Sequence, residues 1–150
     1  PGGALEHYTA PELDALLAEM LRVVRPGGVV SHVVDHRDHL HHADRRLPFL
    51  AHLAWPDPVY RALAGHSLGF HNRLPPADVQ ARFVAAGFAP IALRRMIYVD
   101  EQRPWVDSDR DALRGTPGLT ARILAPRFQT ISPTDLRTAA AHYLFRRPHD

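Results

Sequence analysis

The chain has 150 residues, of which 45% are hydrophobic and 23% are charged, as in ordinary folded globular domains. This length suits one domain with a single core, so residues 1–150 are treated as one unit. The 18 basic residues are all arginines and are scattered, and the formal net charge is only +2, which argues against a nucleic-acid partner. The absence of cysteine excludes disulfides and thiolate metal sites, and no apolar stretch approaches the ~20 residues of a membrane span. We therefore expect a cytoplasmic protein without a membrane partner.

The first predicted element is an amphipathic helix over residues 10–24. Thr9 and Glu12 have the spacing of a capping box, and Pro11 lies in the first turn, where its missing N–H group costs nothing. Apolar residues then recur every three or four positions, which places one apolar stripe against a core. These residues are Leu13, Leu16, Leu17, Met20, Leu21 and Val24.

The predicted helix ends at residues 25–28, where the sequence is Arg-Pro-Gly-Gly. Proline does not continue a helix, and glycine accepts left-handed backbone angles at little steric cost. Residues 29–34 are β-branched and nearly all apolar, which is typical of a strand buried on both faces of a parallel sheet. A helix that leads into such a strand indicates α/β architecture.

Residues 36–73 interrupt this pattern as a long insertion rich in histidine and aromatic residues. We expect one helix around residues 46–54 and a second around 58–64 within it. Beyond the insertion, the pattern predicts a helix with Gly87 as its left-handed cap, a strand, two short helices and a last strand. In chain order these elements cover residues 78–86, 90–99, 107–115, 120–125 and 140–146. The two strands are expected to pair antiparallel at a sheet edge.

Three motifs in this order resemble the class I S-adenosylmethionine-dependent methyltransferases from their fourth strand onward. They are Leu5-Glu6-His7-Tyr8, Arg25-Pro26-Gly27-Gly28 and Ala86-Gly87-Phe88. The resemblance covers roughly residues 1–147. It implies the carboxy-terminal part of a Rossmann-like methyltransferase sheet, with an antiparallel last strand. Residues 36–73 would be a helical insertion or substrate cover after the fifth strand.

The resemblance starts too late in the family's fold to include a whole cofactor site. The family's glycine-rich loop and its ribose-binding acidic residue belong to earlier strands and have no counterpart here. The chain is therefore expected to need an amino-terminal half or another chain to complete the sheet, and to be inactive alone. In its complete form it would use S-adenosylmethionine and a small organic acceptor.

Polar residues at the expected carboxyl ends of strands are the candidate site, because open α/β sheets bind ligands there. By the resemblance, the candidates for cofactor contact are Leu5, Glu6 and His7. The candidates for removing a proton from the acceptor are Asp35, Asp38 and His39. The candidates for acceptor binding are His36, Arg37, Asn72 and Arg73. No residue is assigned to a metal.

Other interpretations of the same residues stay open. The cluster at residues 35–42 also fits a solvated loop, and the chain also fits a non-catalytic methyltransferase-like subunit. A zinc-dependent hydrolase is a further alternative, since residues 36–39 match the second half of a His-x-His-x-Asp-His pattern. Val34, however, stands where that pattern requires a histidine.

Overall fold

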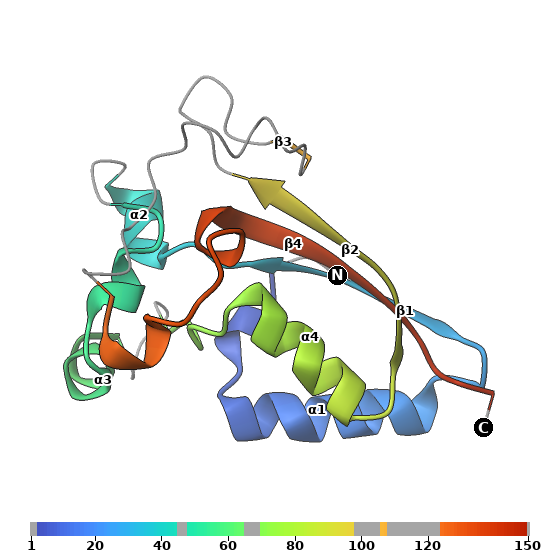
Figure 1. The fold of residues 1–150 in the computed structure, drawn as a ribbon. Helices are drawn as coiled ribbons and strands as arrows, with labels where there is room; N and C mark the ends of the chain where they lie inside the picture. The colour runs from blue at the N-terminus through green and yellow to red at the C-terminus, as the bar shows by residue number, and fades with distance from the viewer. Residues whose placement is uncertain (1–2, 45–47, 65–69, 98–105, 108–123, 150) are drawn as a thin grey trace.

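One sheet organises the computed structural model, which describes residues 3–44, 48–64, 70–97, 106–107 and 124–149 (Figure 1). The strands are β1 (Val29–Asp35), β2 (Ala89–Ile97), the two-residue β3 (Val106–Asp107) and β4 (Thr138–Arg146). Their order is β1-β4-β2-β3, and β4 pairs antiparallel with both β1 and β2. The chain is therefore α/β, and β1 and β2 run parallel to each other on either side of β4. The predicted antiparallel pairing of the last two long strands is confirmed, but β4 lies inside the sheet rather than at its edge.

Two helices, α1 (Ala10–Val23) and α4 (Pro76–Ala85), lie on the same side of the sheet (Figure 1). The capping box at the start of α1 is confirmed, because the Glu12 carboxylate accepts hydrogen bonds from the Thr9 backbone N–H at 2.8 Å and from the Thr9 hydroxyl at 2.7 Å. Gly87 follows α4 with a φ of +104°, the left-handed conformation that favours glycine. Both helices begin and end close to the predicted residues.

The main core lies between these helices and the sheet. Phe83 of α4 is fully buried and stacks on Phe145 of β4 with a centroid separation of 4.4 Å. On β1, Val30 and Val34 are buried whereas Val29 is 49% exposed. The prediction that this strand is buried on both faces is therefore wrong. The physical reason is that α1 and α4 cover the same face, so side chains of β1 alternate between core and solvent.

The insertion forms α2 (His39–Ala43), a 3-10 turn η2 (Ala51–Ala54) and α3 (Asp57–Ala64). Helix α3 confirms the prediction for residues 58–64. The predicted helix over 46–54 is wrong for its described part, where Pro48 precedes two turn residues and the short η2. A proline disfavours helical angles at the residue before it, so a continuous helix is interrupted there. The histidine-rich segment instead forms α2.

The insertion packs on the segment before β4 and forms a second core. The Ala125 N–H donates to the Leu53 carbonyl at 3.0 Å, which joins the two segments. The buried residues of this core are Phe49, Leu50, Leu53, Leu124, Ala125, Phe128, Leu136 and Ala139. The short helices predicted for 107–115 and 120–125 lie largely outside the described residues. Their described parts are Asp107, which lies in β3, and residues 124–125, which are not helical. Among the described helices, none has the length and apolar character that crossing a bilayer requires.

Candidate functional site at the carboxyl end of β1

The carboxyl end of β1 meets segments that are far apart in the sequence. The 3-10 turn η1 (Leu5–His7) lies beside it and is tied to Asn72, whose backbone N–H donates to the Glu6 carbonyl at 2.8 Å and whose amide donates to the Leu5 carbonyl at 2.9 Å. His71 donates from Nε2 to the Asp35 carbonyl at 2.8 Å. Two of the predicted groups, the turn at residues 5–7 and the segment after β1, are thus brought together.

Glu6 and His7 present side-chain atoms to each other within η1. The Glu6 side chain is 2% exposed, its Oε2 has no hydrogen-bond partner, and burial raises the pKa of its carboxyl. The His7 ring is bonded through Nδ1 to the Phe70 carbonyl at 3.1 Å. Because a carbonyl only accepts, Nδ1 is the donor of this hydrogen bond. The Nε2 atom of the same ring lies 4.0 Å from Glu6 Oε1.

His39 faces the same point from α2. Its ring centroid lies 4.9 Å from that of His7, 5.3 Å from that of His71 and 5.9 Å from that of His42. Burial, followed by the nearby His7, lowers the pKa of His39, so its imidazole is neutral at neutral pH. One ligand-type atom from each of Glu6, His7 and His39 lies within 4.8 Å of the others. Among the described residues, this is the set that converges in the manner of a metal or proton-transfer site.

Asp35 and Asp38 have different surroundings. Asp35 forms an ion pair with Arg37, with a shortest oxygen–nitrogen distance of 2.5 Å. Burial raises the pKa of Asp35, but the hydrogen bonds and charge of Arg37 outweigh it and lower the pKa overall. Asp38 caps α2 by accepting from the Leu40 N–H at 2.9 Å, and burial raises its pKa. Asp35 is therefore an ionised and occupied carboxylate, whereas Asp38 supports the helix that carries His39.

His36 points into the core rather than toward His39. Its Nδ1 donates to the Leu74 carbonyl at 3.0 Å, and its Nε2 lies 2.9 Å from the Tyr143 hydroxyl. Burial lowers the pKa of His36 to about 4, so the ring is neutral. The zinc-hydrolase alternative requires His36, Asp38 and His39 to meet. Of these three, only His39 belongs to the convergent set of Glu6, His7 and His39. The structure does not gather that pattern at one point.

Arg73 holds the insertion together. It is 3% exposed, has a φ of +57°, and donates to the carbonyls of His52 at 3.0 Å and Trp55 at 2.7 Å. Its guanidinium also pairs with Asp57 and lies 4.0 Å from the centre of the Tyr60 ring. A residue predicted to bind an acceptor thus has most of its donors engaged within the protein.

The sequence-based prediction missed His71, which lies beside the predicted Asn72. His71 accepts from the Arg73 N–H through Nδ1 at 2.9 Å, and burial lowers its pKa to about 3. Its ring separates His39 from His52, with centroids at 5.3 Å and 4.8 Å respectively. The only signal in the sequence was its position beside two polar residues at the exit of the insertion.

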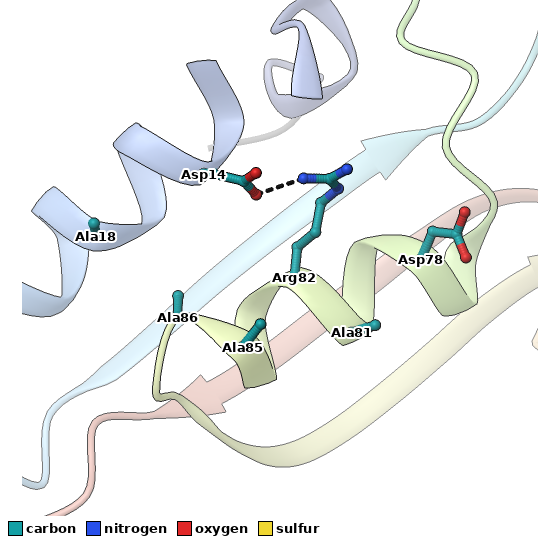
Figure 2. Close-up of a pocket in the computed structure, with 7 residues that line it drawn as sticks. All are labelled: Asp14, Ala18, Asp78, Ala81, Arg82, Ala85 and Ala86. Carbon is teal, nitrogen blue, oxygen red and sulfur yellow. Dashed lines mark hydrogen bonds and ion pairs between the residues drawn. The ribbon is translucent and has the colours of Figure 1, made fainter. Parts of the chain in front are cut away.

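Two cavities lie away from the convergent set. One of about 530 Å³ lies between α1 and α4; Figure 2 shows its lining of small alanines and the ion pair of Arg82 with Asp14 at 2.5 Å. Neither partner of that pair is free for chemistry. The other, of about 670 Å³, is lined by Asn72 and Arg73 together with Arg95 and further residues. Two of the predicted acceptor-binding residues, Asn72 and Arg73, therefore border this arginine-rich cavity, and Asn72 also connects it to η1.

Comparison with models of protein families finds no match, and neither does comparison with curated proteins. The geometry of the site and the sequence motifs are therefore the observations that bear on function.

Proposed function

We propose that this chain supplies the later half of an S-adenosylmethionine-dependent methyltransferase that acts on a small organic acceptor. The observation that carries the proposal is the strand order β1-β4-β2, in which an antiparallel last strand lies between two strands that are parallel to each other. This arrangement agrees with the antiparallel last strand that the sequence motifs imply. It does not follow from the motifs alone, because they specify no strand order.

The outer edge of β1 supports an incomplete sheet. The Val33 carbonyl accepts from the Gly3 N–H at 3.0 Å and the Asp35 carbonyl accepts from His71, so both point away from β4. Val29 at the start of this edge is 49% exposed. Among the described residues no strand pairs with this edge, and an edge of this kind favours pairing with a further strand. We propose that this strand comes from an amino-terminal half of the enzyme or from another chain, and the second source would also suit a non-catalytic subunit.

The residues at the end of β1 fit the place of a cofactor and acceptor. Ligands of open α/β sheets bind beyond the carboxyl ends of strands. The backbone carbonyls of Leu5 and Glu6 already accept hydrogen bonds from Asn72, so contacts to a cofactor would come from side chains of η1. The Glu6 carboxylate, whose Oε2 has no hydrogen-bond partner, suits a cationic group. When bound, S-adenosylmethionine supplies an electrophilic methyl group.

The chain's own contribution to the reaction is orientation and proton removal. His39 is neutral at neutral pH because burial lowers its pKa, so its imidazole is able to accept a proton from an acceptor hydroxyl or amine. Asp35 is the weaker candidate base, because Arg37 holds its carboxylate ionised and hydrogen-bonded. Asp38 acts on His39 by capping α2.

Methyl transfer and cofactor affinity test the proposal together. The natural chain, with whatever residues precede Pro1 in its reading frame, should transfer a radiolabelled methyl group from S-adenosylmethionine to a member of a panel of phenols, amines and carboxylic acids. The 150-residue chain alone should bind the cofactor weakly or not at all in calorimetry. His39→Gln should lower kcat at least ~100-fold, as loss of a general base does, while the matched variant His42→Gln should not. Low-micromolar binding by the short chain, or no cofactor binding by the natural chain, contradicts the proposal.

A further inference from the structure

The Glu6 side chain offers a buried carboxyl group whose burial is only partly compensated, by hydrogen bonds from the backbone of Glu6 and Asp35 and by the nearby His7. Its side chain is 2% exposed, and its Oε2 lacks a hydrogen-bond partner. Its nearest basic group is His7 Nε2, at 4.0 Å from Oε1, which is beyond hydrogen-bond distance. A buried carboxylate with one unpartnered oxygen is costly to ionise, so a cation bound beside it would stabilise its charged form.

Two histidines share this position. The Nδ1–H of His7 donates to the Phe70 carbonyl, which fixes the ring with Nε2 on the side of Glu6. Histidines that bind metals are oriented in the same way, by a backbone carbonyl or carboxylate on the other ring nitrogen. His39 supplies the third atom, and its ring nitrogens make no hydrogen bond within the part of the chain that the structure describes. We propose that Glu6, His7 and His39 bind a divalent transition-metal ion, for which Zn²⁺ is the probe.

The separations are those of an open site that closes by small side-chain rotations. Metal–ligand bonds of ~2.0–2.1 Å in a tetrahedral site place ligand atoms about 3.3 Å apart. The three ligand atoms here lie within 4.8 Å of one another, and one pair lies at 4.0 Å. A contraction of up to about 1.5 Å therefore brings all three to bonding distance.

The donor set favours a particular class of metal. Two imidazoles and one carboxylate suit Zn²⁺, Fe²⁺ or Co²⁺, whereas Mg²⁺ and Ca²⁺ prefer oxygen ligands. Three protein ligands leave at least one coordination position for water or for an acceptor oxygen. A role in holding the acceptor rests on the proposed methyltransferase function, but metal binding itself does not. The ion would also replace the direct cofactor contact predicted for the Glu6 side chain.

Zinc binding to the untagged chain tests the site. Equilibrium dialysis with elemental analysis should find about one tightly bound Zn²⁺ per chain, and Co²⁺ in its place should give the visible absorption of a low-coordinate ion. Glu6→Gln and His39→Gln should each weaken binding at least ~10-fold, since even the loss of a supporting contact outside the ligand set weakens metal sites by that factor. His42→Gln is the matched control, because its ring is 5.9 Å from that of His39 but outside the convergent set.

Three outcomes would overturn the proposal: no stoichiometric Zn²⁺ on the wild-type chain, binding unchanged by both ligand variants, or loss of binding in His42→Gln alone. Circular dichroism of each variant without metal identifies any that fail to fold. Should one ligand variant fail, the other still tests the site. The readout needs neither S-adenosylmethionine nor an acceptor. If the natural chain binds zinc but transfers no methyl group, the proposed function is refuted and the metal site is kept; if it transfers the methyl group but binds no Zn²⁺, the reverse holds.

Discussion

Arg73→Met is expected to detach the insertion from the rest of the domain. The change removes a guanidinium that is 3% exposed, pairs with Asp57, and donates to the carbonyls of His52 and Trp55. Breaking a buried ion pair by removing one partner typically costs about 3–5 kcal/mol, and the partial exposure of Asp57 places this case near about 3 kcal/mol. Arg127 pairs with the same Asp57 at 3.1 Å from an exposed position, so Arg127→Met should cost about 1 kcal/mol at most.

Urea-induced unfolding followed by circular dichroism measures both costs. Hydrogen exchange shows where the loss occurs, because the protection of backbone amides in Arg73→Met should fall more in α3 and η2 than in β4. A further pair of variants separates the cost of the backbone conformation from the loss of the side chain. Residue 73 has a φ of +57°, which favours glycine, so Arg73→Gly should be less destabilising than Arg73→Ala by about 1 kcal/mol. Equal losses in Arg73→Met and Arg127→Met would refute the reasoning, because they would show that burial of the pair contributes nothing.

Three further changes test the core and the site. Acid should destabilise the chain, because burial lowers the pKa of His36 to about 4 and of His71 to about 3. The stability that each neutral ring contributes is complete above 6.5, the pKa of histidine in the unfolded chain. Below that pH each contribution declines by about 1.4 kcal/mol per pH unit. Urea midpoints that stay constant between about pH 7 and about pH 5 would contradict the assignment. Without metal, Glu6→Gln should stabilise the chain by about 1 kcal/mol and so raise its thermal midpoint, because it removes a buried carboxyl whose Oε2 has no hydrogen-bond partner; an unchanged or lower midpoint would show that the carboxylate is satisfied. Phe83→Ala should cost about 3–5 kcal/mol in urea unfolding. A loss below ~1 kcal/mol would mean that the stack on Phe145 is not central to the core.

The position of His39 affects how the candidate site is interpreted. A neutral imidazole held between His7 and His71 is suited both to accepting a proton and to binding a metal, but it cannot do both at once with the same nitrogen. With a metal ion bound, His39 would hold the ion, and an acceptor at the open coordination position would lose its proton to solvent water, because the ion would lower the pKa of the bound group. The comparison of His39→Gln with His42→Gln in the methyl-transfer and zinc assays separates these roles.

The elements whose signals are local could be predicted from the sequence. The spacing of Thr9 and Glu12, the apolar repeat after them, and the glycines at residues 27–28 and 87 each act within about four residues, so α1, α4 and the strands that follow them lie close to the expected residues. The motifs also predicted that residues after β1 and residues 5–7 would share one end of the sheet, and the structure brings His7 and His39 together there.

Contacts between distant segments were decided by the tertiary structure alone. Side chains of β1 alternate between buried and exposed because both helices pack on one face of the sheet. The nearly continuous apolar run at residues 29–34 does not indicate whether one face or both are covered. The same limit applies to side-chain chemistry. Arg37 pairs with Asp35, and His36 turns into the core. The Oε2 atom of Glu6 is buried without a hydrogen-bond partner because η1, β1 and residues 70–73 meet at one point. Residue type and spacing identify groups capable of chemistry, whereas burial and long-range contacts determine their charge and partners.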